Sequence, residues 1–315
     1  NTSEDLLYAV PVPEQAGVSN TTVTMNAASM NNSGFEFSAT YRNRDRDFKY
    51  ELSANLSTLR NRVTSLGFGT DSYISGAYIT NVGQEIGQFY GWAYEGIART
   101  QEDLDNHATQ EGAQIGDCLY KDISGPDGKP DGKVDANDQV VLGSGMPKIH
   151  FGLNARFEYK RFDLSIATFG ALNYHVSDDI YNSLNSCYGW GNKEVGMLDA
   201  NRFSEDGSTY LSNVPRTYVT NSASLGWNDL FSSRKIQNAA YWKIANIELG
   251  YNFPNEWFGK YVSDVRFYVS AQNLHTFTGY HGYNVDYAGG TFTPGYNFCS
   301  YPTARTFMCG VHFTF

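Results

Sequence analysis

The fold class is decided by the stretch Ile149-His150-Phe151-Gly152-Leu153-Asn154-Ala155-Arg156-Phe157-Glu158-Tyr159. Its odd-numbered positions are apolar or aromatic, whereas its even-numbered positions, Gly152 aside, are polar or charged. Because the side chains of a β-strand point to alternate faces, this pattern predicts a strand with one apolar and one polar face. The stretch is longer than the usual globular strand of about 5–6 residues and near the length of a tilted strand that crosses a bilayer.

The same alternation recurs along the chain. Further predicted strands cover 34–44, 47–59, 162–176, 235–253, 264–275 and 303–315. With shorter candidates included, we expect about nine or ten strands. The composition agrees, because 31 Gly, 23 Tyr and 20 Phe accompany only 18% charged residues, a profile that favours strands over helices. An antiparallel transmembrane barrel and a soluble sandwich both fit this alternation.

The predicted connections differ in length. Tight turns join strands near Arg44–Arg46 and at Lys160-Arg161, whereas 177–231 and 276–302 are long and rich in Gly, Asn, Ser and Tyr. Outer-membrane barrels have short periplasmic turns and long extracellular loops, so we predict that the tight turns are periplasmic. Counting strands from them also places the C-terminus in the periplasm. Segment 99–116 fits this scheme poorly. The strand count places it among the periplasmic turns, although it is too long for a tight turn.

The last strand supports the barrel. Its apolar face is formed by Phe307, Cys309, Val311, Phe313 and Phe315. A terminal Phe on an alternating strand resembles the signal that barrel-assembly machinery reads, with Phe307, Val311, Phe313 and Phe315 as its candidate residues. Strand length, unequal loops and this terminal Phe together favour an all-β, antiparallel transmembrane barrel over a sandwich. A short helix is predicted at Gln101–His107.

Several other classes of function are disfavoured. The net charge of −10 argues against nucleic acid as a partner, because phosphate binding needs clustered Lys and Arg. The six histidines lie in no catalytic motif, and no phosphate loop or dinucleotide fingerprint is present; we therefore predict that the chain is not an enzyme. The cysteines lack metal-type spacing, although Cys187 and Cys299 both lie in predicted outer loops and could form a disulfide.

The best candidate for a local site is an acidic loop between residues 122 and 138. Counted from Asp127, its later carboxylates follow the spacing of an EF-hand or dockerin calcium loop. Lys129 departs from that pattern at position three, so Asp122 and Ser124 are alternative first ligands. The predicted ligands of a structural calcium ion are Asp122, Ser124, Asp127, Asp131, Asp135, Asp138 and the carbonyl of Lys133. The alternative is a solvated acidic turn.

Aromatic residues are frequent in the predicted long loops. The candidates for substrate binding are Tyr188, Trp190, Trp227, Tyr280, Tyr283, Tyr287 and Tyr296. Their rings could stack on sugars or hold peptide side chains. Equally, they could pack between loops or against a lipoprotein lid. Tyr241 and Trp257, near strand ends, are candidates for an interfacial aromatic girdle.

An ordered set of short segments resembles the SusC-like TonB-dependent transporters of Gram-negative outer membranes. The matching segments are Met30-Asn31-Asn32-Ser33-Gly34-Phe35-Glu36-Phe37, Gly87-Gln88-Phe89-Tyr90-Gly91-Trp92 with Glu95-Gly96-Ile97, Leu142-Gly143-Ser144-Gly145-Met146-Pro147-Lys148 after the acidic loop, Asn246–Tyr251, and Ser270-Ala271-Gln272-Asn273-Leu274. The resemblance runs from about residue 30 to the last residue, and its specificity comes from the order of the segments.

The resemblance implies a plug-filled barrel of about 22 strands, lidded by a SusD-like lipoprotein and energised by TonB. Residues 1–315 would be its C-terminal part, with the plug, the TonB-contacting segment and the first strands absent. Such a chain would be a fragment, a processed product or one piece of a split polypeptide. Its partners would be the rest of the barrel, outer-membrane lipid, the lipoprotein and TonB.

The expected function is active import of an oligosaccharide or oligopeptide. A porin is a second possibility within transport. A secreted, soluble β-rich module that binds carbohydrate or peptide is an alternative from another class, and a secreted hydrolase has little support in the sequence.

Overall fold

The computed structural model describes residues 2–11, 22–45, 47–66, 70–187, 191–217, 226–258, 262–286, 289–298 and 300–315. Over these residues the regular secondary structure is almost entirely β, with two short α-helices and several 3-10 turns. None of the described helices is long and apolar enough to span a membrane. The predominance of strands over helices confirms the predicted all-β fold.

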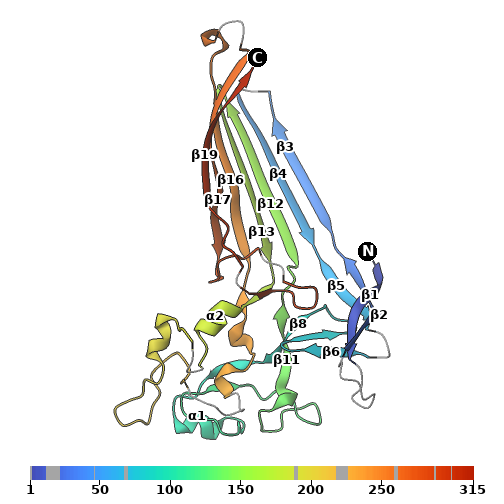
Figure 1. The fold of residues 1–315 in the computed structure, drawn as a ribbon, viewed down its shortest axis with the longest axis vertical. Coiled ribbons are helices and arrows are strands. Elements are labelled where there is room, and N and C mark those ends of the chain that lie inside the picture. The colour runs from blue at the N-terminus through green and yellow to red at the C-terminus, as the bar shows by residue number, and fades with distance from the viewer. Residues whose placement is uncertain are drawn as a thin grey trace.

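A tall antiparallel sheet dominates the molecule (Figure 1). Its seven strands follow the order β19-β17-β16-β13-β12-β4-β3. Their bounds are β3 Glu36–Asn43, β4 Phe48–Thr58, β12 Ile149–Tyr159, β13 Phe162–Leu172, β16 Tyr241–Asn252, β17 Asp264–Thr278 and β19 Thr306–Thr314. Each of these strands overlaps one predicted from alternation. We refer to this set as the wall sheet.

The two ends of the wall sheet differ. The connections β3–β4, β12–β13 and β16–β17 lie at one end together with the C-terminus, which we call the turn end (Figure 1). All other connections lie at the opposite end, the loop end. The C-terminus therefore lies at the same end as the tight turns, as predicted by counting strands from those turns.

The segment between β4 and β12 corrects the expected strand count. Although 90 residues separate these strands in sequence, they are direct neighbours, paired from Thr58 with Ile149 to Phe48 with Tyr159. The intervening residues fold at the loop end and do not cross the wall sheet (Figure 1). The wall sheet thus has seven strands among the described residues, fewer than the expected nine or ten. Segment 99–116 lies at the loop end and not among the tight turns.

Small sheets occupy the loop end. Their strands are β1 Thr2–Pro11, β2 Thr22–Ser33, β5 Arg60–Ser65, β6 Ser72–Ser75, β7 Tyr78–Asn81, β8 Gln88–Trp92, β9 Tyr94–Ile97, β10 Cys118–Tyr120, β11 Gln139–Ser144, β14 His175–Asp178, β15 Gln237–Asn238 and β18 Tyr296–Asn297. Pairing of β2 with β5 extends the β3–β4 hairpin beyond the wall sheet.

Short helices connect these strands. The helices are α1 Gln101–Asn106, α2 Asp179–Leu184, and the 3-10 turns η2 Ala136–Asp138, η3 Val195–Asp199, η4 Trp227–Asp229, η5 Ser233–Lys235 and η6 Asn255–Trp257. Helix α1 confirms the short helix predicted at Gln101–His107. Thr100 caps its N-terminus and Asp103 completes the capping box, which explains where it begins.

Strand register divides the wall sheet into an apolar and a polar face. One apolar row crosses the whole sheet through Tyr41, Leu52, Ala155, Ile166, Ile247, Ala271 and Phe307. The neighbouring row, shifted by one residue, is polar except at Ala167. It runs through Thr40, Ser53, Asn154, Ala167, Asn246 and Gln272. Since side chains alternate, register keeps each set on its own face.

The buried cores lie at the loop end, not beneath the wall sheet. One core gathers Ala171, Tyr174, Val176, Ala239, Tyr241, Tyr280 and Val285. The apolar face of the wall sheet is by contrast open, with exposed fractions of 63% for Phe37, 47% for Leu153 and 69% for Phe307. Exposed apolar surface of this extent indicates an interaction with lipid or protein.

Candidate functional site

The polar face of the wall sheet is the candidate functional surface. From mid-sheet toward the loop end its exposed side chains include the amides of Asn55, Asn154 and Gln272. Near the turn end it becomes charged, with Arg156 on β12 and Glu248 on β16. A face of this kind tolerates contact with water, whereas the opposite face does not.

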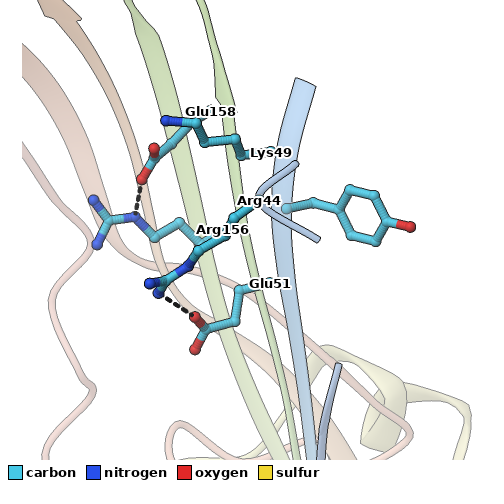
Figure 2. Close-up of a pocket in the computed structure, with 6 residues that line it drawn as sticks. Arg44, Lys49, Glu51, Arg156 and Glu158 are labelled. Atoms are coloured by element: carbon cyan, nitrogen blue, oxygen red, sulfur yellow. Dashed lines mark ion pairs between the residues drawn. The ribbon is translucent and has the colours of Figure 1, made fainter. Parts of the chain in front are cut away.

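A charged cluster lies on this face near the turn end (Figure 2). Glu51 accepts from Arg42 Nε at 2.8 Å and lies 3.6 Å from Arg44 Nη2. Arg156 Nε lies 3.1 Å from Glu158 Oε1. A cavity of about 310 Å³ is lined by Arg44, Lys49, Tyr50, Glu51, Arg156 and Glu158. Tyr50 also borders the cavity, although alternation places its side chain on the apolar face. Exposed pairs of this kind contribute little stability but set the local charge.

A second charged group links three strands. Arg266 on β17 donates to Asp163 on β13 through Nε at 3.0 Å, and to Glu248 on β16 through Nη2 at 2.8 Å. Its side chain crosses β16 over Gly250, where a Cβ atom would lie 2.4 Å from the guanidinium. Gly250 thus leaves room for an ion triad that fixes the register of β13, β16 and β17.

At the loop end, a buried carboxylate joins distant segments. Asp117, only 2% exposed, binds Arg216 with both oxygens and accepts from Asn228 Nδ2 at 2.8 Å. Asn228 in turn accepts from the backbone N–H of Cys118. Burial raises the pKa of the Cys118 thiol to about 12. The thiol therefore stays protonated at neutral pH, and the hydrogen bonds of Asp117 and Asn228 tie these distant segments together.

The acidic loop is held by backbone amides. Asp138, fully buried, accepts from the N–H groups of Ile123, Ser124 and Asp135 at 2.7 to 3.0 Å. Asp122 accepts from the N–H groups of Asp131 and Gly132. Burial alone would raise the pKa of Asp138, but these backbone hydrogen bonds outweigh it and lower the pKa below its ordinary value.

The predicted calcium ligands do not converge in this geometry. Among the residues that the structure describes, no three carboxylate, His or Cys side chains are grouped to hold a metal ion. Asp131 and Asp135 instead accept from the N–H groups of Lys133 and Asn137. Backbone N–H groups therefore brace the loop in this geometry. Calcium, with Asp127 among its ligands, stays a prediction, and metal analysis of the purified protein tests it.

We expect Asp138→Ala to loosen residues 122–139, because three part-buried hydrogen bonds from backbone N–H groups would lose their acceptor. The expected local cost is about 2–3 kcal/mol, measured as faster hydrogen exchange of this loop. Since the folded-state pKa is lowered, this stabilisation is present above the ordinary carboxyl pKa of about 3.9 and is lost as pH falls through the lower folded-state value. Asp127→Ala, at an exposed position, is the matched control; equal effects would contradict the bracing role.

The predicted aromatic candidates have different surroundings. Tyr283 is 72% exposed and Tyr296 is 36% exposed, so both can still meet a ligand. Tyr280 is 6% exposed, and its hydroxyl donates to Asp178. Trp227 donates its indole N–H to the carbonyl of Glu111 at 2.8 Å. Packing between loops accounts for Tyr280 and Trp227. Tyr188, Trp190 and Tyr287 lie outside the described residues.

Other predicted residues can also be located. Cys187 is a buried free thiol, and Cys299 lies outside the described residues. Tyr241 is buried in the loop-end core and cannot be part of a girdle, whereas Trp257 is 67% exposed at the turn end. The terminal-strand residues are exposed on the apolar face: Phe307, Val311, Phe313 and Phe315. Their role in barrel assembly stays a prediction.

Sequence reasoning missed the ion triad of Asp163, Glu248 and Arg266. Each residue occurs on the polar face of a strand, so alternation alone gave it no special role. The available signal was Gly250, since an isolated Gly within a strand often marks a close approach of another group.

An amphipathic antiparallel sheet with tight turns at one end and long loops at the other defines a portion of a transmembrane β-barrel. No family model matches the chain. TonB-dependent receptor P3 of Formosa agariphila is 30% identical to it over 99% of the chain, and TonB-dependent receptor SusC of Bacteroides thetaiotaomicron is 26% identical over 99%. The chain spans 31% and 29% of the lengths of these relatives.

Solved structures agree on the fold. A structure of the RagAB peptide transporter superposes with a TM-score of 0.75 at 22% identity, covering 98% of this chain and 32% of that one. The open-open state of the RagAB peptide importer gives a TM-score of 0.73 at 23% identity. The resemblance to SusC-like TonB-dependent transporters is therefore confirmed along nearly the whole chain, and the wall sheet has the fold of part of such a barrel.

Proposed function

We propose that this chain forms part of the barrel of a TonB-dependent transporter in a Gram-negative outer membrane, which imports an oligosaccharide or oligopeptide. The observation that carries the proposal is the two-faced wall sheet. Its apolar face would contact lipid, and its polar face would border the transport path. The protein would move its substrate without covalent change, in keeping with relatives named receptors and transporters rather than enzymes.

The unequal ends of the wall sheet give the barrel its orientation. By the usual asymmetry of such barrels, the turn end would face the periplasm and the loop end the exterior. The loop end would then meet the substrate first. Energy coupling through TonB would depend on other parts of the transporter, so no coupling residue is assigned in this chain.

A SusD-like lipoprotein is the proposed partner at the loop end. Val195 and Leu198 of η3 are 79% and 84% exposed, and exposed apolar side chains near one another favour a protein contact. We expect Leu198→Asp to weaken binding of the lipoprotein about tenfold, the usual effect of losing a contact worth about 1.4 kcal/mol. Ile74→Asp, at a 53% exposed position on β6, is the control. Equal affinities for both variants and the parent would remove η3 from the interface.

Import is tested with the complete transporter in cells and in planar bilayers. We expect uptake of the inducing nutrient to require TonB, and the purified protein to show no large constitutive conductance. A large open pore would indicate a porin instead. A protein that stays soluble without detergent and binds ligand alone would indicate a soluble binding module.

A further inference from the structure

The apolar face of the wall sheet contains a hollow of about 520 Å³ near its centre. Register explains its origin. Ala39 pairs with Ala54, and Ala155 pairs with Leu52 next to them, so three short side chains lie close together on adjacent strands. Longer side chains border this depression: Tyr41, Leu52, Leu153, Ile166 and Trp242.

The lining of the hollow is apolar in character. Among the described short side chains that line the hollow on this face, Thr168 alone carries a hydroxyl. Thr168 is buried. Its hydroxyl already donates to the carbonyl of Leu153 at 2.8 Å. Thr40, Ser53 and Asn154 also border the hollow, but register places their side chains on the opposite face. A ligand would therefore gain from dispersion contacts and not from hydrogen bonds.

The hollow is continuous with the exposed surface that faces lipid in this fold. Its borders remain exposed, with fractions of 60% for Tyr41, 47% for Leu153 and 40% for Trp242. It extends from mid-sheet toward the loop end, because Trp242 pairs with Gly170 close to the end of β13. Lipid chains from the loop-side half of the bilayer reach this depth.

We propose that this hollow holds one acyl chain of a lipid from the loop-side leaflet, which stays bound as a resident lipid. The inference rests on the membrane location in the proposed function. If the hollow were empty, the side chains that line it would lose dispersion contacts on their open side. Van der Waals packing of this kind drives association within a bilayer. A flexible saturated chain fills an irregular apolar groove, whereas a flat protein surface would leave it empty.

The test uses the complete transporter, extracted gently and measured by native mass spectrometry for bound lipid. We expect the parent protein to retain one lipid, and Ala54→Leu combined with Ala155→Leu to lower retention roughly tenfold, since filling the hollow removes on the order of ten atom contacts. Ala271→Leu, on the same face outside the hollow, is the matched control and should retain lipid like the parent.

A second readout uses Trp242, which borders the hollow. In vesicles of phosphatidylcholine brominated on its acyl chains, we expect Trp242 fluorescence to be quenched in the parent and less so in the filled variant. Equal retention in all three proteins, or a change of oligomeric state in the filled variant, would overturn the proposal. Heat-modifiable migration of each variant in gel electrophoresis reports barrel assembly independently of lipid binding. A failure of the proposed membrane location can therefore be distinguished from a failure of lipid binding.

Discussion

Leu153→Arg is expected to destabilise the assembled barrel by about 2–4 kcal/mol, the cost of a cationic side chain near the middle of the bilayer. Leu153 is on the apolar face at mid-sheet and is 47% exposed. Lipid cannot solvate a guanidinium at that depth, so the cost falls on the folded barrel. The measurement is reversible unfolding of the complete transporter in lipid vesicles.

The control for Leu153→Arg is the adjacent residue. Asn154→Arg places the same side chain on the polar face, at an exposed position in the same strand. We expect its effect to stay within about 0.5 kcal/mol, as for most surface substitutions. A larger cost for Asn154→Arg than for Leu153→Arg would reverse the assignment of the two faces.

Arg266→Leu is expected to destabilise the barrel by about 2 kcal/mol or more, because removing one partner of a largely buried ion pair leaves charges uncompensated. Asp163 and Glu248 would then face each other without the cation between them. Unfolding measurements in the same vesicles report the change.

Arg42→Leu is the matched control for Arg266→Leu. Arg42 is also paired with a carboxylate on the polar face, but its side chain is 57% exposed, so we expect a loss below about 1 kcal/mol. A double-mutant cycle with Asp163→Asn isolates the coupling within the triad. Equal, small losses in both single variants would show that the triad does not fix the strands.

The wall sheet could be predicted from local sequence because its signal is local. Alternation along 149–159 and 162–172 is set by which side chains face lipid and which face water, and both strands were found within a few residues of their observed ends. The tight turn at Lys160-Arg161 further fixed their pairing. These features need no knowledge of distant residues.

The pairing of β4 with β12 could not be predicted in the same way. The residues between them form short strands of their own, such as β8 Gln88–Trp92, and a strand count made from local sequence adds these to the wall. Only long-range pairing shows that they form small sheets at the loop end. The spacing of the acidic loop likewise does not reveal that Asp138 accepts three backbone N–H groups. Calcium binding by this loop stays a prediction.

The central claim is that the two faces of the wall sheet meet different solvents. It is tested most directly by nitroxide labels placed singly along residues 149–159 of the complete transporter in a bilayer. We predict collisions with oxygen, which partitions into lipid, at the odd positions and with a water-soluble nickel chelate at the even ones. Labels shielded from both reagents at the odd positions, with that face packed inside a water-soluble protein, would contradict the account.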